Sequence, residues 1–131
     1  MSHSLFAGCA IDAHAFTLRA YPGGARIFVP GDRADIIYMI VFGQVALTHC
    51  YMTHLPACEV FADGDAVGLE AAFADRRRET ATSMAFTVLG AIPRNHLRVL
   101  IEFEPRIALN VARIMHERLK NVRAILVAGR R

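Results

Sequence analysis

The sequence predicts one mainly β domain of short strands, followed by a long C-terminal helix. Two observations carry this prediction. Between residues 20 and 93, turn-forming residues separate short runs of β-branched and aromatic residues. After Pro93 this pattern ends, and the apolar residues recur at helical spacing. A chain of 131 residues is long enough for one domain with its own core. Short strands at this spacing favour a small barrel or sandwich, which shelters the strand edges.

The strand-rich segment, residues 20–93, follows an N-terminal segment, residues 1–19, whose pattern is weakly helical or irregular. Glycine and proline mark the turns, at "YPGG" (21–24), "PGDRAD" (30–35) and "ADGD" (62–65). The expected strands lie in "ARIFV" (25–29), "IIYMIVF" (36–42), "QVALTHCY" (44–51), "CEVF" (58–61) and "TATSMAFTVLGAIP" (80–93), the last of which holds two. The run 36–42 is apolar throughout, as is typical of a buried strand.

Residues 94–131 form the expected helical segment. Its longer helix starts near Pro105, which suits a first turn, and ends near Gly129. One stripe of this helix is apolar, and its members are Val111, Met115, Leu119, Val122 and Leu126. Such a stripe packs either on the helix's own domain or on a partner helix. A helix of roughly 35 Å is longer than this domain needs to cover itself, so we expect a homodimer paired through this stripe.

Composition excludes several classes of protein. The net charge of +3 is spread along the chain and gives no basic patch that would indicate nucleic-acid binding. No apolar run reaches the roughly 18 residues of a membrane span, so no membrane association is expected. An odd number of cysteines, three, fits reduced thiols in a cytoplasmic protein. Paired catalytic carboxylates, a nucleophile elbow and a P-loop are not found, and we therefore expect no enzyme.

A metal or redox sensor remains an alternative because of "HCYMTHLPAC" (49–58). This stretch contains His49, Cys50, His54 and Cys58, which are residue types that bind metals. Their spacing matches no zinc finger, and adjacent residues on a strand point to opposite faces. The sequence therefore predicts no metal site here.

Three stretches carry a resemblance to a known family. They are "YPGGARIFVPGDRADIIYMIVFGQVAL" (21–47), "GDAVGLEAAF" (64–73) with "RETATSMA" (78–85), and the terminal "AILVAGRR" (124–131). The chain resembles the cyclic-nucleotide-binding-like sensor domain of the CRP/FNR family of bacterial transcription regulators, with "GLE" after "GD" as in its FNR/FixK-like branch. The resemblance implies a jelly roll, or double-stranded β-helix, with a dimerisation helix behind it. It implies DNA as a partner only through a further domain that this chain lacks.

The resemblance also implies a ligand loop, whose candidate residues here are Gly64, Gly68, Glu70, Arg78, Thr80 and Ala81. In nucleotide-binding relatives a glutamate follows the matching glycine and binds the ribose, and an arginine before the small pair neutralises the phosphate. This chain has Leu69 and Glu79 at those positions. We therefore expect a degenerate or altered pocket without a cofactor. The alternative is a stand-alone module that binds a cyclic nucleotide through Arg78. Arginines 76–78 are otherwise expected to be solvated surface residues.

Overall fold

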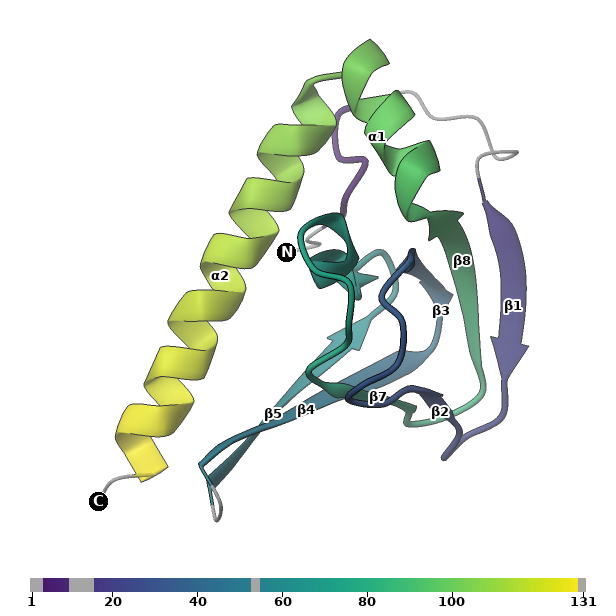
Figure 1. Ribbon diagram of the computed structural model, residues 1–131. Coiled ribbons are helices and arrows are strands. Elements are labelled where there is room, and N and C mark those ends of the chain that lie inside the picture. The colour runs from purple at the N-terminus through teal and green to yellow at the C-terminus, as the bar shows by residue number, and fades with distance from the viewer. Residues whose placement is uncertain (1–3, 10–15, 53–54, 130–131) are drawn as a thin grey trace.

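The strands form two antiparallel sheets that face each other, and two helices follow them (Figure 1). The computed structural model describes residues 4–9, 16–52 and 55–129. The first sheet has the order β1-β8-β3-β6 and the second the order β2-β7-β4-β5. The elements are β1 (Thr17–Tyr21), β2 (Arg26–Phe28), β3 (Ile36–Phe42), β4 (Gln44–Met52), β5 (Leu55–Ala62), β6 (Ala66–Val67), the 3-10 helix η2 (Leu69–Ala72), β7 (Thr80–Ser83), β8 (Thr87–Pro93), α1 (Arg94–Phe103) and α2 (Arg106–Gly129). The predicted mainly β fold with a long C-terminal helix is confirmed.

The core of the roll lies between the two sheets. In β4, the alternate residues Val45 and Leu47 point into this core, as the two-residue period of the sequence predicts. The buried side chains of this core are Phe28, Tyr38, Ile40, Val45, Leu47, Phe61, Val67, Ala81, Leu89 and Ala91. The β3 run was expected to be buried throughout, but Val41 and Phe42 at its end are 47% and 56% exposed. A register shift between Ile40 and Phe42 ends the regular pairing with β8 and turns these residues outward.

A second apolar cluster joins one end of the roll to the helices. It includes Leu69 of η2, Leu97 of α1, and Ile107, Val111 and Ile114 of α2. The first half of α2 therefore packs on its own domain, while the second half extends beside strands β4 and β5 (Figure 1).

The N-terminal residues 4–9 are fixed to the start of α2. The side-chain amide of Asn110, which is buried, donates hydrogen bonds to the carbonyl oxygens of Leu5 and Ala7, both at 3.0 Å. Strand β1 begins at Thr17, three residues before the expected start of the strand-rich segment, and α1 begins at Arg94 as expected. Within the described ranges, none of the helices is long and apolar enough to cross a membrane.

Candidate functional site

The loop after β6 is built around a buried arginine. Gly68 caps η2 with a φ of +77°, a conformation that disfavours residues with a side chain. A Cβ atom at this position would lie 2.7 Å from Nη1 of Arg77. That Nη1 donates to the carbonyl oxygen of Gly68 at 2.9 Å and pairs with Glu70 at 3.1 Å, while Nη2 donates to the carbonyl oxygen of Ile36. The guanidinium also lies 4.1 Å from the centroid of the Phe28 ring.

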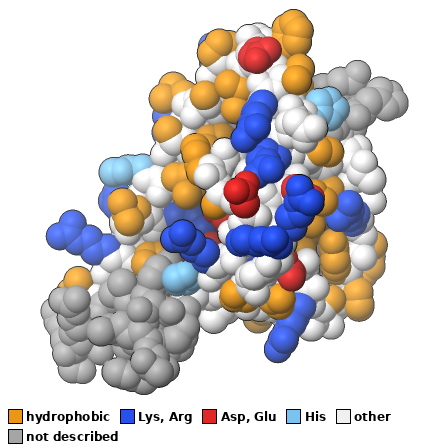
Figure 2. Space-filling view, viewed as in Figure 1, with side chains coloured by type: hydrophobic (Ala, Val, Ile, Leu, Met, Phe, Trp, Pro, Cys, Tyr) orange, Lys and Arg blue, Asp and Glu red, His pale blue; other side chains and the backbone are white. Residues whose placement is uncertain are grey.

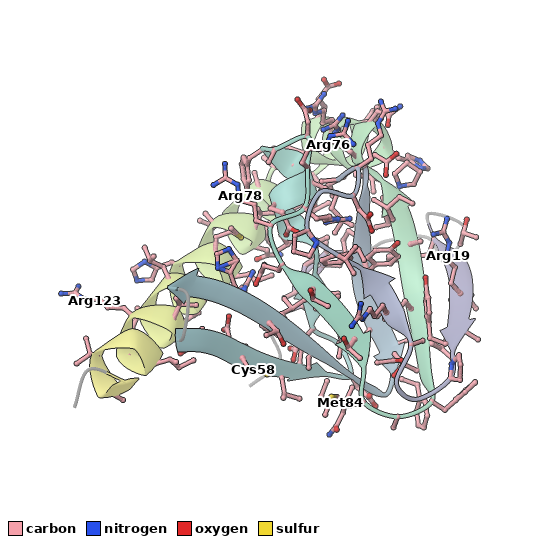
Figure 3. The ribbon with its side chains drawn as sticks, turned by 60° about the horizontal axis from the view of Figure 1, so that its bottom comes forward. Arg19, Cys58, Arg76, Arg78, Met84 and Arg123 are labelled. Carbon is pink, nitrogen blue, oxygen red and sulfur yellow. The ribbon has the colours of Figure 1, made fainter. Side chains whose placement is uncertain are left out.

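These contacts correct the expectation that arginines 76–78 are all solvated. Arg77 is only 3% exposed, whereas Arg76 and Arg78 are exposed. Figure 3 shows Arg76 and Arg78 projecting outward from this loop. The difference has a physical reason, because a guanidinium is buried only where carbonyl oxygens, a carboxylate and an aromatic face replace its water. The loop supplies all three to Arg77.

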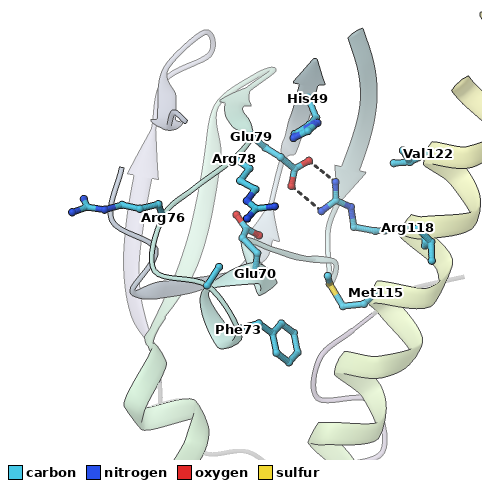
Figure 4. Close-up of a pocket in the computed structure, with 11 residues that line it drawn as sticks. His49, Glu70, Phe73, Arg76, Arg78, Glu79, Met115, Arg118 and Val122 are labelled. Atoms are coloured by element: carbon cyan, nitrogen blue, oxygen red, sulfur yellow. Dashed lines mark hydrogen bonds and ion pairs between the residues drawn. The ribbon is translucent and has the colours of Figure 1, made fainter. Parts of the chain in front are cut away.

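Glu79 directly precedes β7 and is held by an arginine of the long helix. Nη1 and Nη2 of Arg118 donate to Oε1 and Oε2 of Glu79 at 2.9 and 2.5 Å (Figure 4). Nε and Nη2 of the same arginine donate to Oε1 of Glu59 on β5, at 3.1 and 2.9 Å. The side chains of Glu79 and Glu59 are 8% and 9% exposed. One guanidinium thus joins α2 to two strands of the roll, and we call this group the Arg118 triad.

The triad carries a net negative charge, since two carboxylates share one guanidinium. Burial alone would lower the pKa of Arg118, but the hydrogen bonds and charge of Glu79, and then those of Glu59, outweigh it and raise that pKa above its ordinary value. Arg118 therefore stays cationic at every accessible pH. Its hydrogen-bonding edge is already directed at the two carboxylates.

A cavity of about 610 Å³ lies between the loop, β4 and α2. Its lining combines apolar side chains of the loop and helix with charged groups. The residues that line it include Glu70, Phe73, Arg78, Glu79, Met115, Arg118 and Leu119. Volumes of roughly 300–1,000 Å³ are usual for sites that hold small molecules.

The predicted loop residues do not all meet at this cavity. Glu70 and Arg78 line it, whereas Gly68 lies behind Arg77 and outside the lining. Thr80 and Ala81 belong to β7, where Ala81 is fully buried in the core of the roll. Gly64 is in the turn between β5 and β6, where its amide donates to the carbonyl oxygen of Ile40.

The predicted apolar stripe of α2 turns partly toward its own domain. Val111 and Val122 are 5% and 7% exposed, and Met115 packs against the same cluster as Val111. Leu119 is 69% exposed, and the side chain of Leu126 lies outside the described residues. Three of the five residues thus serve the chain's own packing, because the helix lies along the roll. Leu119 is the exposed apolar member that a partner could contact.

The candidate metal ligands do not form a cluster in the described part of the chain. His49 pairs with Ala57 and Cys58 pairs with Thr48, so His49 and Cys58 point to opposite faces of the sheet. His49 lines the cavity, while Cys58 is exposed on the other face, where it accepts a hydrogen bond from Thr48 at 3.8 Å. The side chain of Cys50 and all of His54 lie outside the described residues. No group of three metal-binding side chains occurs among the residues that can be described.

Sequence reasoning missed two members of the site, Glu59 and Arg118. Glu59 is 59 residues from Arg118, and Glu79 is 39 residues from it. No local pattern signals such a contact, because it depends on how α2 lies across the roll. The only trace in the sequence is a carboxylate where the resemblance implies an arginine, which calls for a compensating cation elsewhere.

Residues 18–103 match the family described as the cyclic nucleotide-binding domain. The chain belongs to the cyclic nucleotide-binding domain family. The cyclic AMP receptor protein of Thermus thermophilus is 32% identical over 111 residues, which make up 80% of this chain and 50% of that protein. The chain thus spans half the length of that relative.

Solved structures agree with this assignment. The crystal structure of the Thermus thermophilus catabolite activator protein has a TM-score of 0.79 and 26% identity, over 95% of this chain and 62% of that chain. FixK2 from Bradyrhizobium japonicum has a TM-score of 0.71 and 18% identity, over 83% and 55%, which shows a shared fold alone. The resemblance to CRP/FNR regulators and the jelly-roll expectation are confirmed. The placement within the FNR/FixK-like branch stays a prediction.

Proposed function

We propose that this domain is the sensor and dimerisation domain of a CRP/FNR-type transcription regulator whose pocket no longer binds a cyclic nucleotide in the way that the family resemblance implies. The observation that carries the proposal is the Arg118 triad. Glu79 stands where an arginine would neutralise the phosphate, and Arg118, the cation beside it, is occupied by two carboxylates.

Electrostatics gives the size of this effect. A phosphate about 4 Å from Glu79 would be repelled by roughly 4 kcal/mol at an effective dielectric constant of about 20, or about a thousandfold in affinity. Arg118 does not offset this repulsion cheaply. Turning it toward a phosphate leaves Glu59 and Glu79 unpaired and nearly buried, and breaking a buried pair in this way costs about 3–5 kcal/mol.

The helix α2 supports a role in dimerisation. It exposes Leu109, Leu119 and Val127, which are 50%, 69% and 51% exposed. Large apolar side chains repeated along 24 helical residues favour a partner helix. Arg118 lies on the same helix, so a change in the pocket and a change in helix pairing are mechanically linked. In a full-length regulator, the output would be a change in how two α2 helices meet.

Calorimetry with cyclic AMP and cyclic GMP tests the altered pocket. We expect no saturable binding of either nucleotide at concentrations up to about 1 mM. The alternative module, which binds through Arg78, would instead give micromolar binding that Arg78→Ala abolishes. That result would overturn the proposal.

Light scattering tests the dimer. We expect the native chain to be a dimer and Leu119→Glu to be a monomer, because a carboxylate cannot be buried between two helices without a partner. Val99→Glu is the matched control, since Val99 of α1 is also an exposed apolar residue, at 47%. A Leu119→Glu protein that remains a dimer would refute the assignment of α2 as the interface.

A further inference from the structure

The cavity beside the Arg118 triad has walls suited to an apolar ligand. Phe73 of the loop is 72% exposed although it lines the cavity, and Met115 and Leu119 line the cavity from α2. Figure 4 shows Phe73 and Met115 on the side of the cavity opposite His49. Apolar side chains left open to a concave site favour an occupant that removes them from water.

The charged groups leave one positive charge in excess. The cavity lining contains three guanidinium groups and two carboxylates, those of Arg76, Arg78, Arg118, Glu70 and Glu79. Arg77 pairs with Glu70, and Glu59 pairs with Arg118, which brings the total to four guanidinium groups and three carboxylates. Two of the guanidinium groups form ion pairs within the protein, Arg77 with Glu70, and Arg118 with Glu59 and Glu79. Figure 2 shows that basic side chains gather on this face of the molecule.

Arg78 supplies the unbalanced charge at the cavity. It lines the cavity, is exposed, and makes no hydrogen bond or ion pair with any residue that the structure describes. Arg76 lines it too, but its guanidinium points away from α2 (Figure 4) and lies 3.4 Å from the carbonyl oxygen of Gly31. A guanidinium without a carboxylate partner, at a cavity with apolar walls, favours a ligand with a single negative charge.

A further feature lies next to Arg78. Oε2 of Glu70 is buried and has no hydrogen-bond partner among the described residues, although Oε1 pairs with Arg77. A buried carboxylate oxygen without a donor is costly, and a hydroxyl group of a ligand would satisfy it. The cavity wall thus offers an apolar surface and one guanidinium, and Glu70 adds a buried acceptor that a small shift of its side chain would open to the ligand.

From these contacts we infer that the cavity binds a monocarboxylate with an apolar body, such as a medium-chain or aryl-substituted acid, with its carboxylate on Arg78 and its body against Phe73, Met115 and Leu119. This inference rests on the proposed function, because it names the ligand class of the altered pocket. The side chains of the triad carboxylates, which repel a phosphate, are nearly buried, at 8% and 9% exposed. The anion of the ligand stays at the loop, where the excess positive charge is.

Three probes with one apolar body separate charge from hydrophobicity. Decanoate, 1-decanol and decylamine are titrated below their micelle concentrations into the native protein, by calorimetry. We expect decanoate to bind about tenfold more tightly than decanol, as a charge-assisted contact predicts, and decylamine to bind most weakly. A hydroxylated analogue, 3-hydroxydecanoate, should bind at least as tightly as decanoate because of Glu70.

Two variants and a control assign the contacts. Arg78→Gln should remove the preference for decanoate over decanol while leaving decanol unchanged, and Phe73→Ala should weaken both by a similar factor. Arg98→Gln, an exposed arginine of α1 outside the cavity lining, should change nothing. Both loop residues are exposed, so the variants should remain folded, which far-UV circular dichroism checks.

Some outcomes would overturn the inference. They are equal binding of the three probes, a decanoate preference that persists in Arg78→Gln, or a lack of saturable binding for both decanoate and 4-phenylbutyrate. If decanoate, 4-phenylbutyrate and the cyclic nucleotides all fail to bind, the proposed sensor function would stand, and only the assignment of its ligand would be wrong. Binding of cyclic AMP would instead remove the proposed function itself.

Discussion

Removing the cation of the Arg118 triad is the most direct test of how α2 is held to the roll. Arg118→Met keeps an unbranched side chain of similar length but leaves Glu59 and Glu79 without their guanidinium. Their side chains are 9% and 8% exposed, so water replaces the lost contacts poorly. Breaking a buried pair in this way costs about 3–5 kcal/mol. We expect about 3 kcal/mol, because the triad lies at the edge of an open cavity.

Urea unfolding, followed by circular dichroism at pH 7, measures this loss as a difference in the free energy of unfolding. A loss of this size is a large part of the roughly 5–15 kcal/mol that stabilises most domains. The raised pKa of Arg118 keeps its contribution complete below the unfolded-state value, so alkaline conditions below about pH 12 should not remove it.

Two controls make the result interpretable. Lys120→Met removes an exposed pair with Glu117, at 3.6 Å on the same helix, and should cost less than about 0.5 kcal/mol. The triple variant with Glu59→Gln, Glu79→Gln and Arg118→Met should regain most of the loss, because no charge is left buried. A cost below about 1 kcal/mol for Arg118→Met, or no recovery in the triple variant, would refute the account of the triad.

Three further substitutions test other parts of the fold. Gly68→Ala should cost about 1–3 kcal/mol in urea unfolding, because its Cβ would lie 2.7 Å from Nη1 of Arg77 at a φ of +77°; an unchanged midpoint would contradict this. Burial, and then the charge of Tyr21, raise the pKa of Tyr38, so its contribution is complete below the unfolded-state value and is lost as pH rises through the folded one. The native protein should therefore lose stability more steeply than Tyr38→Phe above about pH 10, and parallel curves would count against it. Asn110→Ala should increase amide hydrogen exchange in residues 4–9, and unchanged protection would show that their anchor lies elsewhere.

The strands could be predicted from the sequence because their signals are local. The run at residues 36–42 coincides with β3, and the pair of strands within residues 80–93 is β7 and β8. Glycine and proline mark the turns between them, and Pro105 directly precedes α2. Each of these signals depends on backbone sterics within a few residues.

The site could be predicted only in part because its chemistry depends on contacts between distant residues. The sequence shows a glutamate at position 79 where the resemblance implies an arginine, but it does not show that a guanidinium from α2 pairs with this glutamate. The same holds for Arg77, whose burial depends on Ile36 and Phe28 from other strands. Three adjacent arginines have identical local patterns, and only the tertiary structure separates the buried one from its two exposed neighbours.

The shared guanidinium of the Arg118 triad also limits how this domain can evolve. Substituting arginine at position 79 alone would place two cations beside the single carboxylate of Glu59. Substituting Arg118 alone would leave the carboxylates of Glu59 and Glu79 nearly buried and without a cation. Either single substitution passes through a weakened intermediate, so the gain of a phosphate-binding arginine at position 79 requires at least two coordinated changes, on elements that are far apart in the sequence. Relatives that share the triad should therefore vary at the outer wall of the pocket more readily than at the triad.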